Sequence, residues 1–375
     1  MRGSRPEARI VRVEVFGYDL SYAHGRYVMS KGREVTTLPS TVVALTTASG
    51  ARGYGEVCPL GPNYLPAFAA GARAALAELA PALLGREVTA PAALYRTMDG
   101  ALAGHAYAKS AVDIACHDAL GRLSGLPVST LLGGRQVEQL PIYVAVPLAG
   151  PGEMAEFIAA RRAEGVHRFQ LKLGGDPRED AARVRAALEA TTEEDLLVAD
   201  ANGGWRLADA VTAVRLLEDA PRLFLEQPCP TLEECLQVRR RTSLPMILDE
   251  VIVGPAALLR AVSARAMEGV NLKINRVGGL TPARLLRDLC VELGLSLTIE
   301  DSWGGDLTTA AVSHLAASTP GEQLLSTSFM NDWTNEHVAG HEPRARGGVG
   351  SAPLGSGLGV SVDDSMLGSR LFDCS

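Results

Sequence analysis

The sequence predicts an α/β protein, a (β/α)8 TIM-type barrel that is preceded by an α+β segment. Eight short apolar runs recur at regular spacing between residues 140 and 328, and amphipathic stretches separate them. Such an alternation is typical of parallel βα units. The competing fold is an open doubly wound sheet, but no GxGxxG motif opens the first βα turn, which favours the barrel.

The N-terminal part has a different pattern, which predicts strands followed by helices. Residues 8–22 have the composition of a strand, and the segment STVVALTTASGARGYGEV turns back on itself at Ser49-Gly50, as a hairpin does. Helical periodicity follows at about residues 66–84, 88–102 and 105–123, the last closing at Gly125.

Each of the later apolar runs is short enough to be a buried strand of a parallel sheet. Two of the intervening helices have recognisable starts: Thr231 with Glu234 forms a capping box, and Thr281 precedes a proline as an N-cap does. The predicted strands cover residues 140–146, 168–174, 195–201, 223–228, 244–250, 270–275, 295–301 and 322–328.

A chain of 375 residues is long enough for two domains. We expect an α+β domain over residues 1–135 and the barrel over residues 136–344. The C-terminal segment 345–375 contains a glycine-rich stretch, and we expect it to leave the barrel and pack back on the first domain.

Composition excludes several classes of protein. The net charge of −7 argues against a nucleic-acid partner, and no apolar run reaches the roughly 20 residues of a membrane span. The start lacks the apolar region of a secretory signal. Six cysteines without CxxC spacing suggest neither a zinc site nor a disulfide framework. A cytoplasmic protein with reduced thiols is the simplest interpretation.

Charged residues stand at the ends of five consecutive predicted barrel strands. Lys172 ends the second strand, Asp200 the third, Glu226 the fourth, Asp249 the fifth and Lys273 the sixth. Neighbouring members are one βα repeat apart, so in a closed barrel all five side chains reach the C-terminal mouth, where barrel enzymes carry out their chemistry.

The three carboxylates predict a metal site. They cannot all stay ionised at one mouth without a cation, and oxygen ligands favour a hard ion, above all one Mg²⁺ per active site. Lys172 and Lys273 flank the trio, where a lowered pKa would make either a usable base. A lone acid at a strand end is more often a helix cap or an ion-pair partner, but five charges in register disfavour that interpretation.

Other polar residues allow two interpretations each. Asn63 and Tyr64 could contact substrate or only pack their loop. Asp301 and Trp303 could receive a cationic ring nitrogen, or they could be a capped helix start and a packed indole. His337 and His341 lack the acid of an HExxH motif, so we expect surface histidines.

As a set, QLK (170–172), VADAN (198–202), LEQP (225–228), LDE (248–250) and LKINRVGG (272–279) resemble the mandelate racemase/muconate-lactonizing subgroup of the enolase superfamily, over essentially the whole chain. The resemblance implies that Asp200, Glu226 and Asp249 bind Mg²⁺ and that Lys172 and Lys273 are the acid/base pair. It further implies a homo-oligomer and an α+β domain that caps the barrel, with residues 18–27 and the GPNY loop closing as a lid.

The sequence departs from the usual pattern of the subgroup at one residue of the second strand, and this residue points to a narrower group of enzymes. The subgroup usually has Lys-x-Lys on the second strand, and here the first lysine is Gln170. Stretches such as YGEVCPLGPNYLPA (54–67) and EQPCPTLEECLQVRR (226–240) resemble the dehydratases of cis-3-hydroxy-L-proline, which share this glutamine. Dehydration of that amino acid to 1-pyrroline-2-carboxylate, with competing 2-epimerisation, is therefore the expected reaction, and Gln170 and Asn202 are further candidate substrate contacts.

Several alternatives stay open from the sequence. They are a racemase or epimerase of proline betaine, of another amino-acid derivative or of a dipeptide, and a cycloisomerase. A non-catalytic, metal-stabilised barrel is a remote alternative, because loss of chemistry should first remove the lysines, and both are present.

Overall fold

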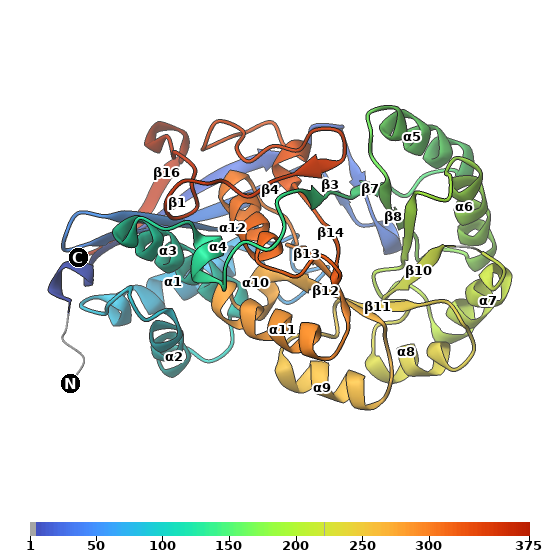
Figure 1. Ribbon diagram of the computed structural model, residues 1–375, viewed down its shortest axis with the longest axis horizontal. Coiled ribbons are helices and arrows are strands. Elements are labelled where there is room, and N and C mark those ends of the chain that lie inside the picture. Colours follow the sequence, from blue (N-terminus) through green and yellow to red (C-terminus); the bar gives the residue numbers. More distant parts are fainter. Residues whose placement is uncertain (1–4, 221) are drawn as a thin grey trace.

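The computed structural model describes residues 5–220 and 222–375, which form an α+β cap beside a parallel barrel (Figure 1). The cap sheet has the order β16-β1-β4-β5, so the last strand of the chain pairs with the first long one. Its strands are β1 (Ile10–Ser21), β4 (Thr37–Thr47), β5 (Arg52–Val57) and β16 (Ser369–Cys374), and its main helices are α1 (Ala69–Leu83), α2 (Pro91–Ala101) and α3 (Ala106–Ser124).

Close packing of α3 on β5 explains two glycines of the predicted hairpin. A Cβ atom at Gly53 would lie 2.3 Å from the carbonyl oxygen of Ala115, and one at Gly55 would lie 2.0 Å from that of Ala111. Any side chain at either position would therefore push the helix off the sheet. The β4–β5 hairpin turns at Gly50, as predicted, with φ +85°.

Within the described residues the barrel has eight parallel strands, in the order β14-β13-β12-β11-β10-β9-β8-β7, and the predicted fold class is confirmed. The helices that follow these strands lie outside the sheet (Figure 1). The strands are β7 (Val144–Val146), β8 (Arg168–Lys172), β9 (Leu196–Asp200), β10 (Leu223–Glu226), β11 (Met246–Leu248), β12 (Gly269–Lys273), β13 (Ser296–Glu300) and β14 (Leu324–Thr327). The helices are α5 (Pro151–Ala163), α6 (Pro177–Glu189), α7 (Leu207–Leu217), α8 (Leu232–Arg239), α9 (Pro255–Ser263), α10 (Ile274–Val277), α11 (Leu280–Glu292) and α12 (Asp306–Ala317).

The last βα unit differs from the ideal repeat. After β14 the described chain forms two 3-10 turns, η3 (Met330–Trp333) and η4 (Asp364–Met366), together with loops and short strands, so no α-helix follows the eighth strand in this part of the chain. The first and last strands meet at one bridge, where the amide of Tyr143 donates to the carbonyl oxygen of Thr327 at 3.0 Å. No helix in the described part of the chain is long and apolar enough to cross a membrane.

One of the two predicted helix starts is confirmed and the other is wrong by two residues. The Thr231 hydroxyl accepts the amide of Glu234 at 3.2 Å at the start of α8. By contrast, α11 already begins at Leu280, so Thr281 is not its N-cap. The reason is tertiary: Asp113 of the cap accepts both the amide (2.8 Å) and the hydroxyl (2.6 Å) of Thr281, and so caps the helix from another domain.

A buried histidine predicts an acid-sensitive fold. The ring of His314 in α12 accepts the amide of Ser129 at 3.1 Å and donates to the carbonyl oxygen of Leu358 at 3.0 Å, and burial lowers its pKa to about 4. The unfolded chain binds this proton near the ordinary value of about 6.5, so folding stability falls as the pH drops from 6.5 toward 4, by about 1.4 kcal/mol per pH unit.

Replacing His314 by glutamine, which keeps one donor and one acceptor, should weaken the dependence of folding stability on pH. We expect calorimetric unfolding temperatures of His314→Gln to depend less on pH than those of the wild type between pH 6.5 and 4. Equal slopes in both proteins would contradict the assignment.

Candidate active site

The parallel register places the predicted residues at one end of the barrel. Lys172, Asp200, Glu226 and Lys273 are the last residues of β8, β9, β10 and β12, and Asp249 follows β11. Lys172 pairs in register with Asp200, and Asp200 with Glu226. All five side chains are buried. The structure therefore brings the five together at the carboxyl ends of the strands.

Ion pairs join the lysines to the outer carboxylates. The Nζ atom of Lys172 lies 2.6 Å from Asp200, and that of Lys273 lies 2.9 Å from Asp249. The guanidinium of Arg276 also lies 2.6 Å from Asp249. Each outer carboxylate is thus neutralised by a cation of the chain itself, and Arg276 is a member of the site that the sequence did not single out.

These pairs reverse the expected pKa of the lysines. Burial alone lowers the pKa of Lys172, but the charges of Asp200, Tyr27 and Glu226 together outweigh burial, and the pKa is raised. In the same way, Asp249, Tyr64 and Glu300 together raise the pKa of Lys273 well above its ordinary value. Lowered values are expected for lysines beside a bound cation, whereas in this arrangement each ammonium is paired directly with a carboxylate.

Glu226, between the two pairs, is held by neutral amides. Its Oε2 accepts from the side-chain amide of Gln170 at 2.9 Å, and its Oε1 accepts from that of Asn271 at 2.6 Å. Burial, and then the charges of Asp200 and Asp249, raise its pKa well above the usual range. The three carboxylates are therefore close enough to repel one another, as the sequence predicted.

The donor set suits a hard divalent cation, although its two outer members are paired with lysines. Three buried carboxylates at neighbouring strand ends offer oxygen atoms only, which is the chemistry of a Mg²⁺ site. In residues 5–220 and 222–375, no three His, Cys, Asp or Glu side chains are already arranged around a single point. A cation would therefore have to displace the ammonium groups from Asp200 and Asp249.

The cap contributes Tyr64 to this end of the barrel. Its hydroxyl donates to Glu250 at 2.7 Å and accepts from Lys273 at 3.1 Å. Asn202 also donates to Glu250, at 3.2 Å. Burial raises the pKa of Glu250 to about 7. Tyr64 thereby links the cap loop to one of the two lysines.

These side chains surround a small cavity, which we call the reaction cavity. Its volume is about 20 Å³, room for about one water molecule. Aromatic rings form much of its wall: the ring centroids of Tyr27 and Trp303 are 5.3 Å apart, and those of Trp303 and Trp333 are 5.8 Å apart. The lining residues are Tyr27, Met29, Leu60, Tyr64, Tyr143, Gln170, Lys172, Asn202, Lys273, Glu300, Asp301, Ser302, Trp303, Met330 and Trp333.

The structure places five of the six predicted substrate contacts in the wall of the reaction cavity and one outside it. Tyr64, Gln170, Asn202, Asp301 and Trp303 line the reaction cavity, whereas Asn63 is exposed and is not among its lining residues. The carboxylate of Asp301 accepts the backbone amides of Ser302 at 2.6 Å and Asn275 at 3.2 Å, so it is held by local backbone.

Besides Arg276, sequence reasoning missed three further side chains near this centre: Tyr143, Asn271 and Tyr27. Tyr143 donates to Glu300, and Asn271 bridges Glu226 and Glu300, at 2.7 Å from the latter. Asn271 stands two positions before Lys273 and so shares its face of the strand, which is a signal that could have identified it. Tyr27 is the last residue of the expected lid segment 18–27, but it was not singled out as part of the site, and it lines the reaction cavity.

His337 and His341 were expected to be surface histidines, but the structure buries both in part. Their rings stack with centroids 3.9 Å apart. His341 lies 2.7 Å from Asp332, and His337 lies 3.2 Å from Asp306. The pair fastens the loop that replaces the eighth helix, a tertiary contact that the sequence spacing did not reveal.

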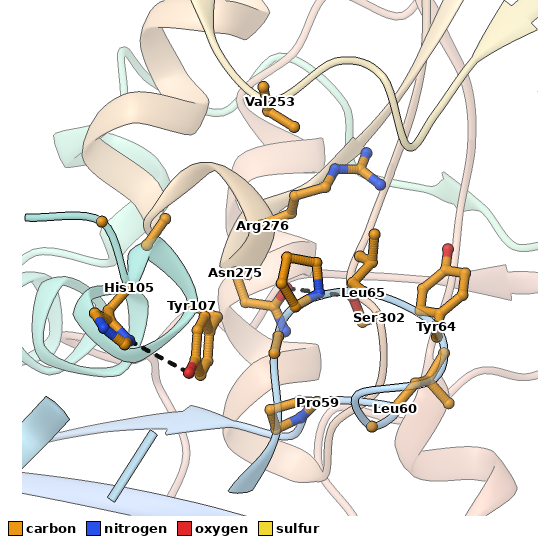
Figure 2. Close-up of a pocket in the computed structure, with 15 residues that line it drawn as sticks. Pro59, Leu60, Tyr64, Leu65, His105, Tyr107, Val253, Asn275, Arg276 and Ser302 are labelled. Atoms are coloured by element: carbon orange, nitrogen blue, oxygen red, sulfur yellow. Dashed lines mark hydrogen bonds between the residues drawn. The ribbon is translucent and has the colours of Figure 1, made fainter. Parts of the chain in front are cut away.

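A second cavity, of about 240 Å³, lies between the cap and the barrel (Figure 2). Its walls come from residues 59–61, 64–67 and 104–107 of the cap and from Val253, Asn275, Arg276 and Ser302 of the barrel. Leu60, Tyr64 and Ser302 line both cavities. These three residues therefore form the partition between the second cavity and the reaction cavity.

An α+β cap over a parallel barrel, with carboxylates and two lysines at its carboxyl end, defines the mandelate racemase/muconate-lactonizing class of the enolase superfamily. Residues 153–366 match the enolase C-terminal domain-like family, and residues 23–133 match the mandelate racemase/muconate lactonizing enzyme N-terminal domain. The chain belongs to this family.

Named relatives agree with that assignment. The chain is 45% identical to a cis-3-hydroxy-L-proline dehydratase from Roseibium aggregatum, over 96% of this chain and 98% of the relative. It is 28% identical to an N-succinyl-L-Arg/Lys racemase from Bacillus cereus, over 91% and 92%. A crystal structure of an enolase superfamily member from Roseovarius nubinhibens, complexed with magnesium, superposes with a TM-score of 0.92 at 38% identity, covering 98% of this chain and 99% of the other.

Proposed function

We propose that this protein removes the α-proton of a cyclic amino acid and dehydrates cis-3-hydroxy-L-proline to 1-pyrroline-2-carboxylate, with 2-epimerisation as a competing reaction. The observation that carries the proposal is the arrangement of Lys172 and Lys273 on β8 and β12, on either side of the three carboxylates of β9 to β11. The 45% identity to a dehydratase of that amino acid supports the choice of substrate.

We further propose that Asp200, Glu226 and Asp249 hold one Mg²⁺. When bound, the ion supplies positive charge that neutralises the trio and the developing charge of a substrate carboxylate. The amides of Gln170 and Asn271 orient Glu226 from behind, as outer partners orient the ligands of metal sites. Displacement of the ammonium groups from Asp200 and Asp249 would leave both lysines next to the substrate.

In this proposal each lysine faces one side of the substrate ring. One lysine removes the α-hydrogen as a neutral amine, and the other remains an ammonium on the opposite face. The ammonium can protonate a leaving hydroxyl, which gives elimination, or the α-carbon, which gives the epimer. Trp303 and the neighbouring rings of the reaction cavity provide faces that suit a cationic ring nitrogen.

Solvent deuterium uptake tests the proposed reaction directly. We expect cis-3-hydroxy-L-proline and L-proline to exchange the α-hydrogen in D₂O with Mg²⁺ present, as followed by NMR, and EDTA to stop the exchange. Only the hydroxylated compound should form 1-pyrroline-2-carboxylate. If neither compound exchanges its α-hydrogen, the proposed function is wrong.

The reaction cavity must enlarge to admit a proline ring, because its present volume suits about one water molecule. Tyr64 separates it from the larger second cavity, so movement of the GPNY loop would join the two (Figure 2). We therefore propose that this loop and residues 18–27 act as the lid over the substrate.

Truncation of Tyr64 should change both steady-state constants. Tyr64→Ala opens the partition at one of its three residues and removes the hydrogen bonds to Glu250 and Lys273, so we expect kcat to fall and KM to rise, together lowering kcat/KM about 10- to 100-fold. Tyr64→Phe keeps the partition and should retain KM more closely. Unchanged kcat and KM in Tyr64→Ala would show that the loop is only structural.

A further inference from the structure

Two side-chain amides that line the reaction cavity have their nitrogen atoms engaged and their oxygen atoms unpaired. Gln170 is 4% exposed, and Asn202 is 6% exposed. In residues 5–220 and 222–375, no hydrogen-bond donor reaches the Oε1 atom of Gln170 or the Oδ1 atom of Asn202. A buried acceptor without a donor is unusual in a folded protein, and it calls for a ligand.

The orientation of both amides follows from their carboxylate partners. The Nε2 atom of Gln170 donates to Glu226 at 2.9 Å, and the Nδ2 atom of Asn202 donates to Glu250 at 3.2 Å. In this arrangement each amide presents its nitrogen to a carboxylate oxygen, and its own oxygen has no partner. The carbonyl oxygen of each amide is therefore the polar atom that remains for a ligand when the reaction cavity enlarges.

The lysine that usually stands in place of Gln170 would offer only hydrogen-bond donors at this position, and no acceptor. An ammonium has three donors and no acceptor, whereas the glutamine keeps one donor for Glu226 and adds an acceptor without charge. Among the fully buried polar atoms of residues that line the reaction cavity, in the described part of the chain, the Nε1 atom of Trp303 is a donor without a partner. The two unpaired oxygen atoms therefore match a ligand with two donors.

We propose that Gln170 and Asn202 accept the two N–H groups of a free secondary ammonium and so select a cyclic amino acid against its N-alkylated forms. The inference rests on the proposed function, which supplies the α-amino acid. It goes further by excluding a betaine, whose nitrogen carries no hydrogen and would leave both buried oxygens unpaired.

The test uses three ligands that keep the ring, the positive nitrogen and the carboxylate and differ in their number of N–H groups. They are L-proline with two, N-methyl-L-proline with one and N,N-dimethyl-L-proline with none. With Mg²⁺ at saturation, titration calorimetry of the wild type should show affinity falling about tenfold for each N–H group removed.

Two variants distinguish hydrogen bonding from steric exclusion of the methyl groups. Gln170→Lys keeps a donor toward Glu226 but loses the acceptor, and Gln170→Met loses the acceptor without adding charge. In both, the affinity ratio between L-proline and its dimethyl form should fall from about a hundredfold to about tenfold. Glu268→Gln, just before β12 and outside the reaction cavity, is the control and should leave the ratio unchanged.

The outcomes separate the two proposals. Equal affinities of the three ligands in the wild type, or an unchanged ratio in both Gln170 variants, would overturn the selection by Gln170 and Asn202, even where L-proline exchanges its α-hydrogen. Failure of every proline to exchange would instead overturn the proposed function. A Mg²⁺ titration of each Gln170 variant shows whether its metal site is intact, so that an altered ratio can be assigned to the ligand contact.

Discussion

Replacing Asp200 by asparagine, or Glu226 by glutamine, should abolish turnover while the fold persists. Two remaining carboxylates hold a divalent cation poorly, and loss of its charge is worth several kcal/mol in the transition state. We therefore expect kcat/KM to fall by a factor on the order of 10³ or more, as measured by product formation. Mg²⁺ titration of the same variants should show correspondingly weak binding.

The two substitutions should differ in their effect on stability. Asp200→Asn removes the partner of the buried Lys172, so it should lower the unfolding temperature. Glu226→Gln is accommodated more easily, because the free oxygen of Gln170 can turn toward the new amide while Asn271 continues to donate. Circular dichroism of both variants should show the secondary structure of the wild type.

A matched control lies at the other end of the barrel. Glu268 precedes β12 and accepts the backbone amide of Met246 at 2.8 Å, so Glu268→Gln removes a barrel carboxylate away from the mouth. It should leave turnover unchanged. Near-normal activity of Asp200→Asn, or of the wild type in EDTA, would refute the metal assignment.

Separate alanine variants of Lys172 and Lys273 should affect the dehydration and the epimerisation of cis-3-hydroxy-L-proline differently. In this isomer the hydroxyl and the carboxylate share one face of the ring, so the α-hydrogen points to the other face. The lysine on the hydrogen's side should be required for dehydration, epimerisation and deuterium exchange alike. Its loss should lower all three about 10²- to 10⁴-fold.

The lysine on the opposite face should be required for epimerisation but not for deuterium exchange. Its replacement should suppress formation of trans-3-hydroxy-D-proline, because no acid then delivers a proton to the second face, whereas exchange on the first face persists. NMR of a reaction in D₂O measures exchange, epimer and 1-pyrroline-2-carboxylate together. In the wild type, irreversible dehydration should eventually consume both isomers.

Lys109 provides the control for loss of a buried ammonium. It lies in the cap and is paired with Asp99 at 2.7 Å. Lys109→Ala should reduce stability without changing the ratio of dehydration to epimerisation. The two-lysine assignment fails if both Lys172→Ala and Lys273→Ala still epimerise the substrate, or if the wild type neither dehydrates nor epimerises it.

The sequence by itself determined the barrel and the register of its charged residues. Parallel strands repeat with one βα unit, and a charged residue that ends a buried run marks the carboxyl end of its strand. Lys172, Asp200, Glu226 and Lys273 were therefore placed at one end of the barrel by local pattern alone. The hairpin at Gly50 and the start of α8 at Thr231 follow from equally local rules.

Only the tertiary structure decided which partners these groups have. The pairing of both lysines with carboxylates, the contact of Tyr64 with Glu250, and the bridge of Asn271 between Glu226 and Glu300 join residues that are 24 to 186 positions apart. The start of α11 likewise depends on Asp113, which is 168 positions away. The physical reason is that periodicity fixes which face and which end of a strand a side chain occupies, whereas its hydrogen bonds and its pKa depend on the groups that closure of the barrel and packing of the cap bring to it.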